Sequence, residues 1–219
     1  MNRLEIRTKA RKILGESTAA FWTDVQLNTW IDDAFDDIAK RTKCIKGNTT
    51  VTTVVSTPEY ALLTNIADCQ SIMEGYYYQD AAVWEKIDPT TREELNRDYP
   101  GWKSAAAGTP FLYYWDIEEN ILGVYPKPNA TNAGAYFQVY YAKLHTDIGS
   151  DVAAVDVPLD LHKAAIEHIV ATGLESRGLR DQAASHWSKY SGYVSAYQVL
   201  RDYDRYEDDD IIMIPGGNA

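Results

Sequence analysis

The spacing of apolar residues changes twice along the chain, and this limits the folds that the chain can adopt. Near both ends apolar residues recur at steps of three and four, the spacing of amphipathic α-helices. Between about residues 48 and 145 the period becomes two, in stretches rich in Thr, Val and Tyr, which is typical of β-strands. We therefore expect an α+β protein: a helical bundle of two N-terminal and two C-terminal helices, with a β-rich insertion and an extended C-terminal tail.

The clearest helix signal is the stretch from Phe21 to Thr42. Thr23 and Gln26 form a capping box at its start. One continuous apolar face follows, made of Leu27, Trp30, Ile31, Ala34, Phe35, Ile38 and Ala39. Four aspartates, Asp32, Asp33, Asp36 and Asp37, lie off that face, and no His or Cys nearby completes a chemical site. We interpret them as the solvated side of a structural helix.

The pattern predicts four segments. Residues 1–47 hold the N-terminal helices, the first of which is basic and stops at Gly15. Residues 48–150 are the β-rich insertion. Within it, Asp88 is expected to cap a short helix with Pro89 at its first position, and Phe111–Ile117 and Ile121–Tyr125 are expected to pair as a hairpin. Residues 151–206 hold an antiparallel pair of helices, and 207–219 form the tail.

The tail joins an acidic block, Glu207 to Asp210, to an apolar run, Ile211 to Ile214, which Pro215 closes. An apolar run beyond the last helix has to be buried somewhere. It can fold back on its own core, or dock on a partner as an added strand, and we favour the partner.

Composition excludes several classes of protein. The 219 residues carry a net charge of −11, which argues against a protein that grips nucleic acid through its phosphates, but not against one that DNA passes without sticking. No apolar run is long enough for a membrane span and no signal peptide is recognisable, so a soluble protein made in the cytoplasm is expected. Two cysteines and four scattered histidines provide no metal site, and no cofactor motif is present.

No catalytic motif is present either: we find no phosphate loop, nucleophile elbow or zinc-protease helix. The chain is therefore not expected to be an enzyme, and no catalytic residue is assigned. The alternative is a carbohydrate-active hydrolase or a glycan-binding β module, because carboxylates are plentiful and the runs Gly75–Tyr78 and Tyr113–Trp115 could stack on sugars. The simpler interpretation of these runs is alternating strand residues, some in a core and some at a subunit interface.

The order of segments resembles the head-to-tail connector (adaptor) proteins of tailed bacteriophages. The likeness covers about residues 1 to 203. It is carried by "FWTDVQLNTWIDDAFDDIAKRTK", "EYALLTNI", "GTPFLYYWDIEENILGVYPKP", "VPLDLHKAAIEHIVATGL" and "ASHWSKYSGYVSAY". The resemblance implies a virion protein at the head-tail interface, in a ring of twelve copies between the portal and the tail protein, through which DNA passes during ejection.

The resemblance also suggests roles for particular residues. A C-terminal extension that reaches the portal would here contain Ile211, Ile212, Met213, Ile214 and Pro215. An acidic lumen would repel DNA phosphates, and the second helix could supply it through Asp32, Asp33, Asp36 and Asp37. These aspartates could instead meet Arg3, Arg7 and Arg11 of the neighbouring copy, because ring contacts join two different surfaces.

Overall fold

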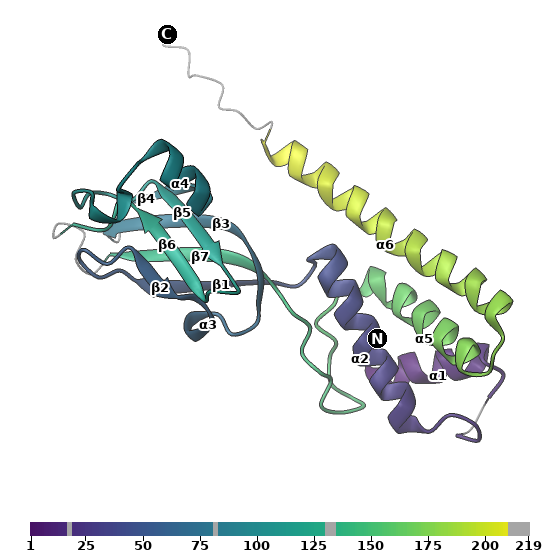
Figure 1. Cartoon of the computed structure of the whole chain (residues 1–219). Coiled ribbons are helices and arrows are strands. Elements are labelled where there is room, and N and C mark those ends of the chain that lie inside the picture. The colour runs from purple at the N-terminus through teal and green to yellow at the C-terminus, as the bar shows by residue number, and fades with distance from the viewer. Residues whose placement is uncertain (17–18, 81–82, 130–134, 210–219) are drawn as a thin grey trace, which may run out of the picture. The chain divides into compact units, whose positions relative to one another are not determined.

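A computed structural model describes residues 1–16, 19–80, 83–129 and 135–209 (Figure 1). The chain divides into two compact units. The helical unit comprises Met1–Cys44 and the chain from His145 onward, and the β unit comprises Ile45–Leu144. Each unit is described separately below.

The helices of the helical unit begin where the sequence provides caps. They are α1 (Arg3–Ile13), α2 (Asp24–Thr42), the 3-10 turn η3 (Leu159–Leu161), α5 (His162–Ser176) and α6 (Arg180–Asp209). The predicted capping box of Thr23 and Gln26 is present, and Asn2 and Glu5 form a second one at the start of α1. α2 ends at Thr42, and the next residue, Lys43, has a φ of 51° that turns the chain out of the helix.

α5 is the central helix of this unit. Its buried residues lie on several of its faces, and α1, α2 and α6 all pack against it. At Gly173 a Cβ atom would lie 3.1 Å from a methyl carbon of Leu14, so the glycine permits the close approach of α5 to the residue that ends α1. Nothing lies within 4 Å of the corresponding point at Gly192, so no close approach explains that glycine.

The expected fold class, a bundle of two N-terminal and two C-terminal helices with a β insertion, is wrong. Among the described residues, the helical residues lie mostly toward the C-terminus, and α6, with 30 residues, equals α1 and α2 together. Further short helices, α3 (Leu62–Asn65) and α4 (Arg92–Asp98), and a 3-10 turn η1 (Trp102–Ser104), lie in the β unit. The β unit is a compact body with a core of its own rather than an appendage. Periodicity located the main helices, but it does not determine how helices pack.

The β unit contains a curled, mixed sheet. In the part of the chain that the structure describes it has seven strands in the order β1-β7-β3-β4-β5-β6-β2. They are β1 (Lys46–Thr52), β2 (Glu59–Ala61), β3 (Cys69–Asp80), β4 (Val83–Pro89), β5 (Leu112–Asp116), β6 (Ile121–Tyr125) and β7 (Tyr136–Lys143). Neighbouring strands are antiparallel except β4 and β5, which pair in parallel through Asp88–Leu112 and Pro89–Tyr113.

The curl of the sheet encloses an apolar core. Val51 on β1 and Val124 on β6 stand far apart in the strand order, yet they belong to the same buried cluster, together with Tyr77, Tyr113 and Phe137. The opposite face of β3 and β7 carries paired tyrosines, with the rings of Tyr78 and Tyr136 stacked 4.4 Å apart and Tyr76 edge-on to Tyr140. The tyrosine-rich runs are therefore alternating strand residues.

The short helix of the β unit begins later than expected. Asp88 and Pro89 belong to β4, because they complete the parallel pairing with β5. Thr91 caps α4 instead: its hydroxyl accepts a hydrogen bond from the Glu94 amide at 3.1 Å, and the Glu94 carboxylate accepts one from the Thr91 amide at 2.9 Å. A complete capping box takes precedence over a proline at the first helical position.

Candidate assembly interface

The arginines of α1 are bound within their own chain. Arg7 is 7% exposed; its guanidinium lies 2.7 Å from Asp151 Oδ2 and 3.4 Å from Asp24 Oδ1, and donates to Asn28 Oδ1 at 2.7 Å. Arg3 adds a second contact to Asp151, at 3.1 Å. Hydrogen bonds from Arg7 hold the pKa of Asp151 below its ordinary value. The cluster joins α1 to the start of α2 and to the segment before α5.

Arg11 is the second buried arginine of α1, with 6% exposure. Its two terminal nitrogens lie 2.7 Å from Glu16 Oε2 and 2.7 Å from Asp24 Oδ1, and one also donates to the Trp22 carbonyl at 2.9 Å. The amides of Ala20 and Phe21 donate to the other oxygen of Glu16. Arg11 and Glu16 together hold the connection between α1 and α2.

The four aspartates of α2 have different surroundings. Asp33 is exposed, and Asp36 pairs with Lys40 at 2.5 Å. Asp37 accepts a hydrogen bond from the Tyr190 hydroxyl on α6 and lies 2.9 Å from Arg41. Asp32 accepts the Ile148 amide at 3.1 Å. Thus Asp32 and Asp37 help to hold the unit together, whereas Asp33 and Asp36 are on its surface.

His145 was missed by the sequence interpretation. Its side chain is 1% exposed, and it lies 2.6 Å from Asp156 and 3.6 Å from Asp32. Burial alone would lower the pKa of His145, but the hydrogen bond and charge of Asp156, together with Asp32, raise it above the ordinary value. Nothing in the sequence joins these three positions, since Asp32 lies on α2 and the other two in the segment leading to α5.

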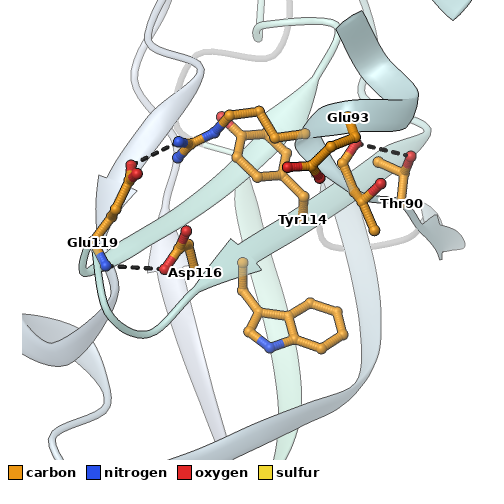
Figure 2. Close-up of a pocket in the computed structure, with 8 residues that line it drawn as sticks. Thr90, Glu93, Tyr114, Asp116 and Glu119 are labelled. Carbon is orange, nitrogen blue, oxygen red and sulfur yellow. Dashed lines mark hydrogen bonds and ion pairs between the residues drawn. The ribbon is translucent and has the colours of Figure 1, made fainter. Parts of the chain in front are cut away.

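The β unit contains a small polar pocket of about 250 Å³ beside the β5–β6 turn, shown in Figure 2. Several of its polar groups make local contacts, although the Nε and Nη2 atoms of Arg92 are buried without a hydrogen-bond partner among the described residues. Arg92 lies across the Tyr114 ring and donates to Glu119 at 2.6 Å, and Asp116 accepts the Glu119 amide at 2.9 Å in the turn. Figure 2 shows Asp116 and Glu119 on one side of Tyr114, with Glu93 and Thr90 on the other.

A glycosidase needs a carboxylic acid whose pKa is raised, so that it can protonate the leaving group. Burial would raise the pKa of the neighbouring Glu59, but hydrogen bonds from Lys103 and from Tyr114, the latter 2.6 Å long, lower it. Among the described residues, the carboxyl groups with a shifted pKa all have it lowered; these are Glu16, Glu59, Glu94, Asp98, Asp151 and Asp156.

Other expected site features can be placed only in part. Over the described ranges, the structure groups no three His, Cys, Asp or Glu side chains in a way that could hold a metal ion. No described helix is both long enough and apolar enough to cross a membrane. The residues expected to bind the portal, Ile211 to Pro215, lie outside the described residues.

These clusters have a structural role, because their ion pairs join segments that are distant in sequence. Residues 1–210 match the family model of the SU10 adaptor protein, so the chain belongs to this family. The resemblance to head-to-tail connectors is thereby confirmed. No curated protein matches the chain. The chain is a structural adaptor of a bacteriophage, a virion component that interacts with other head or tail proteins.

Proposed function

We propose that the chain forms a homo-oligomeric ring between the portal and the tail of the phage, and that DNA passes through this ring without specific binding. The observation that carries the proposal is the family match over residues 1–210, nearly the whole chain. The ring size of twelve is the one implied by the connector resemblance. The proposed role is structural, without catalysis or a cofactor.

The α2 aspartates could line the DNA conduit or pair with arginines of a neighbouring copy, and the charges support the first use. Pairing Arg3, Arg7 and Arg11 with a neighbouring copy would require them to leave Asp151, Asp24 and Glu16. Buried arginines do not exchange partners cheaply, since a lost partner leaves a charge without compensation. We therefore assign Asp33, which is exposed, and Asp36, which is half-exposed and pairs with Lys40, to the wall of the DNA conduit. Their negative charge repels phosphates over about 8 Å at physiological salt.

The tail supplies the proposed contact with the portal. Its apolar run, Ile211 to Ile214, follows an acidic block and ends at Pro215. Such a run gains binding energy by leaving water for a groove or sheet edge of a partner.

The test is mass photometry of the protein with its portal, using the full chain and a chain that ends at residue 206. We expect a large complex with the full chain and its loss on truncation. A full chain that stays monomeric in the presence of the portal would contradict the proposal. Assays of glycan hydrolysis would then be the next experiment, because the hydrolase is the competing interpretation.

A further inference from the structure

The helical unit has a large groove on its surface. Residues of α1, of the segment that leads into α5 and of α5 and α6 surround a volume of about 690 Å³. Its apolar lining is formed by Ile13, Leu159, Ile166 and Tyr193. Ile166 is buried, whereas Ile13, Leu159 and Tyr193 are 49%, 65% and 40% exposed. Exposed apolar side chains gathered in one groove favour binding of an apolar partner.

The groove also carries positive charge. Lys9, Lys12 and Lys163 line it and form no ion pair with any residue that the structure describes. Two acids are present as well, Asp160 and Glu167, but Glu167 is held by the His186 ring at 2.5 Å. A ligand for this groove should therefore combine apolar side chains with negative charge.

The C-terminal tail has both properties in the required order. Four consecutive acids, Glu207 to Asp210, precede four consecutive apolar residues, Ile211 to Ile214. We propose that, in the absence of the portal, the groove binds residues 207–214 of a second copy of the chain. The apolar run lies on Ile13, Ile166 and Tyr193, and the acidic block lies beside the lysines.

The length of α6 excludes the chain's own tail as the occupant. α6 continues to Asp209, so the helix rises about 24 Å between Tyr193 and Asp209. Ile214 follows Asp209 by five residues, which span at most about 17 Å when fully extended. The backbone at Ile214 therefore stays about 7 Å or more short of Tyr193, and the acidic block stays farther still, so the chain's own tail cannot cover the groove while α6 stays helical. A neighbouring copy has no such restriction, and the contact joins two different surfaces, as in a ring or an open chain.

This inference rests on the proposed function in one respect: the proposed function assigns the same tail segment to the portal. One segment cannot occupy both places, so the portal has to displace the groove contact. The tail is then protected from other partners until the portal is present.

Peptide binding tests the groove. A fluorescent peptide of residues 205–216 is titrated with the full-length protein, and its anisotropy is measured. The variant Lys9→Glu/Lys12→Glu/Lys163→Glu should bind the peptide at least about tenfold more weakly, through lost ion pairs and new repulsion. The matched control Lys43→Glu/Lys46→Glu/Lys127→Glu changes the same charge at positions outside the groove lining and should bind normally. A peptide with lysines in place of its four acids should bind the groove variant and not the original protein.

Cross-linking tests whether a second copy is the partner. Cys44 and Cys69 are first replaced by Ser and Ala. A chain with Tyr193→Cys is then mixed with one carrying Met213→Cys and oxidised. A covalent dimer of the two chains is expected, and none with Val199→Cys, an exposed position on α6 outside the groove. A doubly substituted chain that cross-links only within itself would overturn the assignment to a second copy.

The two proposals fail in different ways. Absence of both peptide binding and cross-linking, with portal binding intact, would overturn the groove contact alone. Cross-linking between copies in a protein that ignores the portal would overturn the proposed function and leave the groove contact standing.

Discussion

Arg7 shows how a charged residue can belong to the interior of this protein. It combines contacts to Asp24, Asn28 and Asp151 with almost complete burial. Arg7→Ala leaves these groups without their donor, so we expect the free energy of unfolding of the helical unit to fall by about 2–4 kcal/mol. Urea denaturation followed by circular dichroism measures it. Lys40→Ala removes an exposed ion pair with Asp36 and should change stability little; equal losses for the two variants would contradict this account.

His145 makes stability depend on pH. Its pKa is raised in the folded protein, so its charged form is favoured by folding. The stabilisation is fully present below the unfolded value of 6.5 and is lost as pH rises through the higher folded value. We expect His145→Gln to cost about 1–2 kcal/mol at low pH, the scale of a hydrogen bond between charged groups, and less at high pH. Denaturation from about pH 5.5 to 9 measures the difference from the unsubstituted protein.

His168 provides a control of the opposite sign. It is half-buried, with its ring edge-on to those of Trp187 and Tyr190, and desolvation lowers its pKa. Folding then favours the neutral ring, so His168 reduces stability as pH falls below the ordinary value of 6.5. The free energy of unfolding of the His168→Gln variant should therefore fall less at low pH than that of the unsubstituted protein. If both substitutions changed the pH dependence in the same direction, the assigned environments would be incorrect.

At the scale of elements, the pairing of β5 with β6 includes an aromatic ring that packs directly on a glycine. Tyr114 and Gly123 are register partners, and a Cβ atom at Gly123 would lie 2.1 Å from the Tyr114 ring. Gly123→Ala should force the ring out of its place against Trp102 and destabilise the β unit by about 1–3 kcal/mol. Thermal unfolding followed by tyrosine and tryptophan fluorescence measures this. Gly149→Ala, which meets nothing within 4 Å, is the control and should be neutral.

Elements that depend on nearby residues could be predicted from the sequence. The capping box at Thr23, the strand Ile121–Tyr125 and the antiparallel pair α5 and α6 use signals within a few residues of each other. Asp88 was placed in the wrong element because its decisive contact, the parallel pairing with Leu112, comes from a distant strand.

The architecture and the polar clusters could not be predicted for the same reason. The strand order places β1 beside β7 and β2 beside β6, and nothing local specifies these pairings. Arg7 and Arg11 looked like free surface charges because their partners, Asp24 and Asp151, lie on other elements. His145 was set aside as a scattered histidine although two carboxylates meet it in space. Periodicity identifies a buried face, but it cannot identify a buried charge.

At the scale of the whole molecule, each copy carries a net charge of −11, which the proposed ring would multiply. A ring of like-charged copies repels DNA from its lumen. DNA should therefore pass without forming the ion pairs between phosphates and cationic side chains that release counterions. The part of this charge that faces the conduit, in our proposal, is Asp33 and Asp36. We therefore expect Asp33→Lys/Asp36→Lys to create DNA binding in the portal-bound assembly, where many copies bring the new lysines together, and to create little in the free chain.

The measurement is a filter-binding assay with linear duplex DNA on the portal-bound assembly, over a range of salt concentrations. Binding by the variant should fall steeply with salt, because each neutralised phosphate adds to the slope. Asp98→Lys/Glu118→Lys changes the same charge in the β unit and is the matched control. If the control variant bound DNA as well as the α2 variant, total charge alone would explain the effect and α2 would not line the conduit. If neither bound, the aspartates would lie away from the path of the DNA.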